Sequence, residues 1–250
     1  MTDGNQRDYP GCTIASAARG ATDEPCPYCE SPGTSDCAHL DEDIAQYLAQ
    51  VVTRHDYQAR EVVFSEGEEA SAIGVINDGL AAVVKHTDDG RRQIVGFLTR
   101  GDLFGVSATD DYFASVETIT AVKASLFPRS AFETAVEQHT RLAPQMIRSI
   151  SHELSEAADH QVVLGRFTAR ERIAAFLVGL AQRKWRLEDR GDGLPLPMTR
   201  ADIADYLGLS IEHVSRGFSQ LVRDGIIGLT TPQKVKVLDR PGLERIAHMR

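Results

Sequence analysis

Three polar residues near the C-terminus, Glu212, Ser215 and Arg216, are spaced so that they share one face of a helix, and Ser219 follows one turn later. An arginine binds guanine O6 and N7 together, a carboxylate accepts from cytosine N4, and a serine contacts a base or a phosphate. This combination predicts a helix that reads base edges in the major groove of double-stranded DNA. The alternative is an ordinary helical hairpin in the core of an enzyme.

The residues around this set predict a helix-turn-helix. Thr199 is a good N-cap for a first helix from about Arg200 to Leu207, and Asp202 is its weaker capping-box partner. Gly208 can end that helix in the left-handed conformation, Ser210 can cap a second helix, and Gly225 can stop it. The residues expected to face the core from the second helix are Ile211, Val214, Phe218, Leu221 and Val222.

A second chemical signal is the distribution of cysteine. All four cysteines, Cys12, Cys26, Cys29 and Cys37, lie within 26 positions, and the following 213 positions have none. A C-x-x-C pair with further thiols nearby indicates metal binding or redox chemistry. Four possibilities stay open from the residues alone: an iron–sulfur cluster, a site for zinc or another metal that His39 could join, a thiol–disulfide switch, or thiols without a ligand or a sensor role.

Size and charge suit a protein of one or two domains with real cores. The chain has 250 residues, 42% of them hydrophobic and 25% charged, and its net charge is −9. Residues 166–250 hold 15 basic and 10 acidic residues, a balance of +5, whereas the remainder carries −14. A basic C-terminal part beside an acidic N-terminal part suits a DNA-binding domain joined to a sensor domain. We expect a soluble cytoplasmic protein, because neither an 18-residue apolar run nor a hydrophobic signal region is present.

The elements before the helix-turn-helix fall into four stretches. Residues 1–38 are polar and lack periodicity, so we expect a mobile arm, and Asp41 to about Arg54 is predicted to be a helix. From Tyr57 to about Phe127, short apolar runs alternate with turn signals, which is typical of a small antiparallel barrel or jelly roll. The expected strands are 62–64, 73–76, 80–85 and 93–98.

A long helix is predicted from about Pro144 to Leu164. Its apolar positions Ile147, Ile150, Leu154 and Ala157 recur at the spacing of a seam for a partner helix; packing on the chain's own barrel is the alternative. We expect a hinge near Gly165, a helix from about Ala169 to Lys184 and a short strand flanked by Pro195 and Pro197. A two-stranded wing over 226–238 should follow, with Lys234 and Lys236 facing phosphates.

These features resemble the Crp/Fnr superfamily of transcription regulators, and the Glu-x-x-Ser-Arg pattern of Glu212, Ser215 and Arg216 resembles its Fnr/FixK-like branch. The resemblance extends through residues 170–176, 101–105 and 64–67, and so covers the chain from about residue 40. It implies an α+β fold: an arm over 1–38, a cyclic-nucleotide-binding-like β-roll over 39–141, a dimerisation helix over 142–165 and a winged helix-turn-helix over 166–250. The implied DNA-binding residues are Thr199, Arg200, Ser210, Glu212, Ser215, Arg216, Ser219, Lys234 and Lys236.

The same resemblance implies partners and cofactors. The expected partners are a second copy of the chain, RNA polymerase and a palindromic site similar to TTGAT-N4-ATCAA, without a membrane. Cys26, Cys29 and Cys37 resemble the segment that holds a [4Fe-4S] cluster in oxygen-sensing members, but Ser125 stands at the family's fourth cysteine, so Cys12 or a carboxylate would have to complete the set. Cyclic AMP is not expected, because Val106 follows Gly105 and no arginine lies between Arg100 and Arg129. No catalytic motif supports an enzyme. Two alternatives stay open: a regulator of the same architecture that responds to haem, to thiol redox state or to its own abundance, and a zinc- or thiol-redox-stabilised binding protein that does not regulate transcription.

Overall fold

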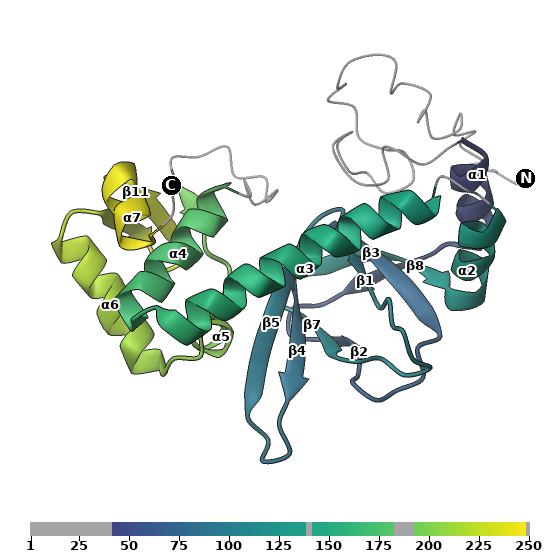
Figure 1. Ribbon diagram of the computed structural model, residues 1–250, viewed down its shortest axis with the longest axis horizontal. Coiled ribbons are helices and arrows are strands. Elements are labelled where there is room, and N and C mark those ends of the chain that lie inside the picture. Colours follow the sequence, from purple (N-terminus) through teal and green to yellow (C-terminus); the bar gives the residue numbers. More distant parts are fainter. Residues whose placement is uncertain (1–41, 139–141, 183–192, 249–250) are drawn as a thin grey trace, which may run out of the picture.

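The computed structural model describes residues 42–138, 142–182 and 193–248. A small β-roll and a C-terminal helical domain lie at the two ends of one long helix, α3, which crosses the molecule diagonally in Figure 1. One core of buried apolar side chains fills the interior of the roll, and a second joins the helical domain to roll residues that include Leu80, Ile94 and Phe97. The α+β class predicted from the sequence is therefore confirmed.

The roll is made of eight antiparallel strands in two four-stranded sheets. One sheet has the order β1-β8-β3-β6 and the other β2-β7-β4-β5, so sequence-distant strands lie side by side. Side chains that include Phe64, Ile76 and Leu98 are buried in the roll interior, and the central strand β3 is buried along most of its length. The strands are β1 Thr53–Tyr57, β2 Val62–Phe64, β3 Ala72–Asp78, β4 Ala81–His86, β5 Arg92–Leu98, β6 Leu103–Phe104, β7 Ser115–Thr118 and β8 Val122–Pro128.

Two short helices, α1 Glu42–Val51 and α2 Arg129–Gln138, pack against the roll through Leu48, Phe132 and Ala135. The predicted first helix was too long, because Arg54 belongs to β1. Arg54 lies opposite Ser125 of β8 in the antiparallel ladder. This pairing between strands overrides the local helical periodicity of the sequence. Helix α2 was not predicted, and it follows β8 without an intervening loop.

The long helix α3 runs from Leu142 to Arg166 and α4 from Ala169 to Gln182. The break between them lies at Phe167 and Thr168, close to Gly165, which is itself still helical. Thr168 begins α4 with reciprocal bonds: its N–H donates to Glu171 Oε2 at 2.7 Å, and its hydroxyl accepts from the Glu171 N–H at 3.4 Å. That backbone bond is the main reason why the pKa of Glu171 falls to about 2.

The C-terminal domain combines helices with a three-stranded sheet of order β10-β11-β9. The predicted wing had two strands, but β9 also pairs with β11, and it includes Pro195 instead of lying between the prolines. Proline fits there because an edge strand leaves its N–H side unpaired. The remaining elements are β9 Leu194–Pro195, α5 Arg200–Leu207, α6 Ile211–Arg223, β10 Ile227–Thr231, β11 Lys234–Val237 and α7 Arg240–Ile246, of which α7 was not predicted. Among the described residues, no helix combines the length and the apolar character needed to cross a membrane.

Candidate nucleic-acid interface

The helix-turn-helix formed by α5 and α6 has the caps that its sequence predicts. The Thr199 side chain accepts from the Asp202 N–H, and the Asp202 side chain accepts from the Thr199 N–H, which makes a complete capping box. Gly208 ends α5 at φ 60°, a left-handed conformation that costs glycine little. The hydroxyl of Ser210 then accepts from the His213 N–H and starts α6. Local chemistry thus sets the angle between the two helices.

One face of α6 is anchored in the domain core. Val214, Phe218 and Leu221 are buried, and Gly217 lies so close to α4 that a Cβ there would stand 2.2 Å from Cδ1 of Ile173. Two predicted core residues are not in the core: Ile211 is 49% exposed and Val222 is also exposed. Each residue turns the helix by about 100°, so both lie about 60–80° away from Val214, at the edge of the buried face.

The opposite face of α6 is exposed and polar. Glu212, Ser215, Arg216 and Ser219 all project into solvent, as the spacing predicted. A hydrogen bond from Ser210 lowers the pKa of Glu212, so this side chain is a carboxylate at neutral pH. An exposed arginine and an exposed carboxylate, one turn apart on a rigid helix, have the hydrogen-bonding groups needed to read guanine and cytosine edges.

The flanking residues of the predicted set are placed differently. The Arg200 guanidinium lies over the Phe218 ring, with 3.6 Å between Cζ and the ring centroid, and burial lowers its pKa. Arg200 therefore packs on the core instead of joining the exposed face of α6. Thr199 is occupied in the α5 cap, while on β11 Lys236 is exposed and Lys234 half-buried.

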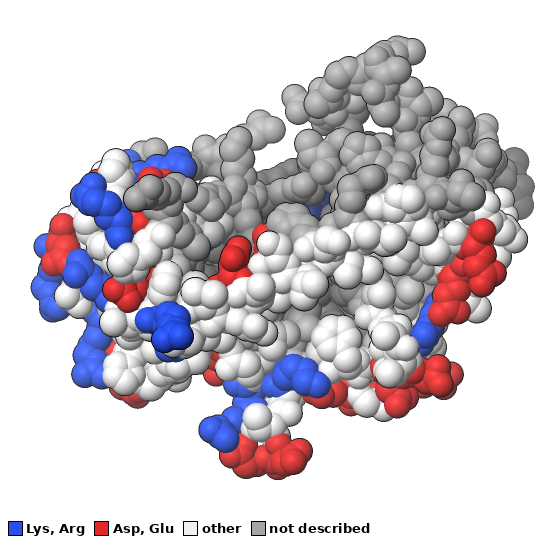
Figure 2. Space-filling model, viewed as in Figure 1, with Lys and Arg blue, Asp and Glu red and all other residues white. Residues whose placement is uncertain are grey.

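Charge is unevenly distributed over the face drawn in Figure 2. Lys and Arg side chains gather at the end of the molecule formed by α6 and α7, with a few acidic residues among them. Asp and Glu are concentrated over the far end of the roll. The end rich in Lys and Arg is thus the end that contains α6, and positive charge attracts the phosphate backbone of DNA.

Helix α3 has an unpaired apolar stripe. Ile147, Ile150 and Leu154 are 63%, 51% and 69% exposed, and Ala157 is exposed as well. All four lie on the seam predicted from their spacing. Large apolar side chains grouped on one helix face mark a surface for association.

The predicted metal ligands remain a prediction, and the structure describes only Ser125, the residue at the family's fourth cysteine position. The four cysteines and His39 lie outside the described residues, within which no group of three or more His, Cys, Asp or Glu is arranged to hold a metal ion. Ser125 is buried in β8, where its hydroxyl accepts from Asn77 Nδ2 at 2.9 Å. Its oxygen is engaged inside the roll, so this position does not fit a ligand for a group held by the N-terminal segment.

Aromatic rings pack in the interior of the roll beside the segment that would contact a cyclic nucleotide. Phe64 stacks on Tyr112 with 4.2 Å between centroids and lies 5.4 Å from Phe104. The Tyr112 hydroxyl donates to Ala72 O at 2.9 Å. A Cβ on Gly105 would stand 2.7 Å from the Phe64 ring, so this part of the roll is tightly filled.

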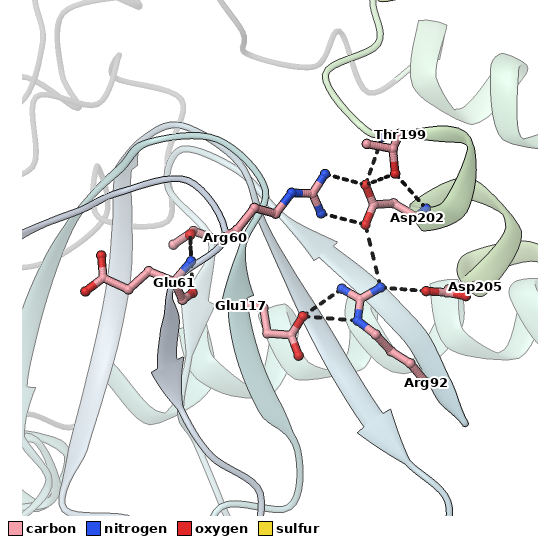
Figure 3. A network of polar contacts seen from close by, with 8 residues as sticks. Arg60, Glu61, Arg92, Glu117, Thr199, Asp202 and Asp205 are labelled. Atoms are coloured by element: carbon pink, nitrogen blue, oxygen red, sulfur yellow. Dashed lines mark hydrogen bonds and ion pairs between the residues drawn. The ribbon is translucent and has the colours of Figure 1, made fainter. Parts of the chain in front are cut away.

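Polar contacts between the roll and α5 were not predicted. Arg60 and Arg92 of the roll bind Asp202 and Asp205 of α5, as Figure 3 shows. The sequence does not indicate that Arg60, in a turn, and Arg92, on a strand, share a role, because charged residues ordinarily lie on the solvated surface. Only the packed structure reveals that they meet.

A β-roll, a long helix with an apolar stripe and a helix-turn-helix with an exposed polar face define a two-domain, DNA-binding class of protein. The Crp-like helix-turn-helix domain matches residues 171–246, and the cyclic nucleotide-binding domain matches residues 54–139. The nitrogen fixation regulation protein FixK of Bradyrhizobium diazoefficiens is 37% identical over 226 residues, which cover 89% of this chain and 93% of FixK. The transcriptional activatory protein AadR of Rhodopseudomonas palustris is 38% identical over 88% of this chain and 92% of its own.

Among solved structures, FixK2 from Bradyrhizobium japonicum superposes with a TM-score of 0.73 at 34% identity, covering 78% of this chain and 97% of FixK2. The chain belongs to the Crp/Fnr family. It is a DNA-binding transcription regulator of the Fnr/FixK type and not an enzyme.

Proposed function

We propose that the protein regulates transcription as a homodimer that binds a two-fold-symmetric DNA site similar to TTGAT-N4-ATCAA. The observation that carries this proposal is the exposed set Glu212, Ser215 and Arg216 on a recognition helix whose opposite face is locked in the core. The base sequence of the site comes from the resemblance to the Fnr/FixK-like branch.

The guanidinium and the carboxylate on α6 bind different bases in this proposal. Arg216 donates two hydrogen bonds to guanine O6 and N7, and Glu212 accepts from cytosine N4. Ser215 and Ser219 contact a neighbouring base or phosphate, and Lys236 on the wing contacts the backbone. The α3 stripe supports a dimer, since two recognition helices about one helical turn of DNA apart would match a palindrome. RNA polymerase is the expected partner at the promoter.

Titration of labelled duplexes at fixed salt tests the reading of bases. Arg216→Ala should weaken binding to the cognate palindrome roughly tenfold to a hundredfold, which corresponds to about 1–3 kcal/mol per bidentate contact. The same substitution should weaken binding far less to a duplex in which another base replaces the guanine that Arg216 contacts. The matched control is Arg245→Ala, which removes an exposed arginine from α7 of the same domain. Equal losses for both variants, or on cognate and scrambled duplexes, would contradict base reading by Arg216.

We also propose that Cys12, Cys26, Cys29 and Cys37 hold a [4Fe-4S] cluster that senses oxygen, redox state or nitric oxide. The supporting observation is the grouping of all four thiols in one segment. Ser125, at the family's fourth position, is the main objection, and it is the reason why Cys12 is proposed as the fourth ligand. When bound, the cluster would supply a site that oxygen or nitric oxide can oxidise or degrade. Thiolates are the ligands that such clusters require, and ligation would order the segment.

Anaerobic reconstitution, followed by iron and sulfide analysis and visible absorption, tests this second proposal. Cys12→Ser, Cys26→Ser, Cys29→Ser and Cys37→Ser should each lose the visible band, whereas Ser125→Ala should keep it because that hydroxyl is bound to Asn77. A band that survives Cys12→Ser would assign the fourth place to a carboxylate or an external ligand. Uptake of zinc would refute cluster sensing in favour of a zinc site, and uptake of no metal would leave a thiol switch or inert thiols; neither outcome bears on DNA binding.

A further inference from the structure

The first helix of the helix-turn-helix rests on the β-roll through a bidentate ion pair (Figure 3). Arg60 Nη1 donates to Asp202 Oδ1 and Nη2 donates to Oδ2, both at 2.8 Å. The Asp202 side chain is only 3% exposed. Burial alone would raise the pKa of Asp202, but the hydrogen bonds from Arg60 and Thr199 outweigh burial and hold it below its usual value. The carboxylate therefore stays charged, and its charge is matched by the roll.

A second arginine of the roll reaches the same helix. Arg92 Nη1 donates to Asp205 Oδ2 at 2.7 Å and lies 3.6 Å from Asp202 Oδ1. Its Nε and Nη2 donate to Glu117 Oε2 at 3.1 and 2.7 Å. Arg92 thus joins a carboxylate of β7 to two carboxylates of α5. We call the set of Arg60, Arg92, Glu117, Asp202 and Asp205 the interdomain clasp.

The roll builds the clasp from two consecutive residues of β7. Glu117 orients Arg92, and Thr118 holds the turn that carries Arg60: the Arg60 N–H donates to Thr118 O at 3.0 Å, and the Thr118 hydroxyl donates to Gln58 O at 2.6 Å. Arg60 itself has φ 68°, an uncommon conformation for a non-glycine residue. A strained backbone held by a buried threonine presents the guanidinium in one orientation, and such strain is concentrated at functional positions.

Aromatic contacts brace the same helix against α3 and β5. The Tyr206 ring of α5 stacks on His160 of α3 with 4.1 Å between centroids, and Phe97 of β5 lies 5.0 Å from it. His160 Nε2 lies 3.1 Å from Tyr206 O, and Gln93 Nε2 donates to the same oxygen at 3.3 Å. The polar contacts of the clasp and these aromatic contacts therefore act together to hold α5 and leave it little freedom to rotate.

Helices α5 and α6 pack in one core, so the position of α5, which Asp202 caps, also determines the position of α6. The clasp holds α5 and leaves the polar face of α6 open to solvent. We propose that Arg60 and Arg92 are positioning residues, which fix the recognition helix relative to the dimer helix and thereby set the half-site spacing that the dimer accepts. This inference rests on the proposed palindrome binding. A bidentate arginine pair suits the task because it fixes geometry as well as charge.

The test compares full-length wild type, Arg60→Gln and Arg60→Gln/Arg92→Gln on palindromes whose half-sites are separated by three, four or five base pairs. At fixed salt, wild type should prefer one spacing. Arg60→Gln should lose about tenfold in affinity at that spacing, the usual size of a lost charged contact, and the double variant more. Binding to a duplex with a single half-site should not change. The control is Arg91→Gln, which removes a neighbouring exposed arginine whose partner is Asp89.

Three results would overturn the proposal: an unchanged spacing preference, a loss equal to that of Arg91→Gln, or tighter binding by the variants. Tighter binding would mean that the clasp restrains the protein from DNA. Small-angle scattering of the free dimers gives a readout that does not depend on DNA. Loosened domains should raise the radius of gyration of the double variant above that of the control. If wild type binds no palindrome, the proposed function fails, and scattering alone then decides whether the clasp positions the domain.

Discussion

Replacement of Leu154 by glutamate should dissociate the dimer, and the structure gives the size of the effect. Leu154 is 69% exposed in the single chain, so about two-thirds of its apolar surface is available to a partner. Full burial of a leucine is worth about 1.5–3 kcal/mol, which leaves roughly 1–2 kcal/mol for each of the two copies. The loss of about 2–4 kcal/mol weakens the dimer about 30-fold to 700-fold before repulsion between the new carboxylates is added.

Sedimentation equilibrium over a range of concentrations measures this change directly. The matched control is Ser155→Glu, because Ser155 is exposed on the same helix but lies about 100° around it from Leu154, away from the stripe. The control should remain dimeric, and Leu154→Glu should also lose affinity for the palindrome. A Leu154→Glu protein with the dissociation constant of wild type would show that the α3 stripe is not the dimer seam.

Three further predictions concern the elements around the site. Gly208→Val should lower the free energy of unfolding by about 1–2 kcal/mol in denaturant titrations, because valine is strained at φ 60°. Gly217→Ala should destabilise the fold by overpacking against Ile173, and Ile173→Val should recover part of that loss because it removes the Cδ1 atom in the way. Burial lowers the pKa of His160 below 6.5, so the folded state should lose stability as pH falls from about 6.5 toward that lowered value, and His160→Gln should flatten this dependence in thermal melts.

The helix-turn-helix was predictable because its determinants are local. Thr199, Asp202, Gly208 and Ser210 act on backbone groups within a few residues, and hydrogen bonds at that range leave a signature in a single sequence. The exposed face of α6 followed from the same periodicity. The prediction that Ile211 is buried is wrong. Helical periodicity gives the direction of a side chain, but it does not tell how far the neighbouring elements extend to cover it.

The strand boundaries and the clasp could not be predicted, because they depend on contacts between residues far apart in the sequence. Local periodicity predicts that Arg54 belongs to a helix. In the structure it pairs with Ser125 of β8, which lies 71 positions away in the sequence. Arg60 and Asp202 are separated by 142 positions. No periodicity connects partners at such distances, and an arginine that will form a bidentate pair looks the same in the sequence as one that stays in solvent.

The four clasp residues that pair across the two parts have charges opposite to the overall charge of the part that supplies them. The acidic N-terminal part supplies Arg60 and Arg92, and the basic C-terminal part supplies Asp202 and Asp205. Loss of Arg60 would leave Asp202 with the longer contact to Arg92 at 3.6 Å, and the added net negative charge beside the domain that approaches phosphates could by itself weaken DNA binding. Asp202→Asn separates the two effects. If repulsion is the cause, Arg60→Gln/Asp202→Asn should regain both affinity and spacing preference. If the clasp positions α6, the double variant should regain affinity at most and still accept the wrong spacings.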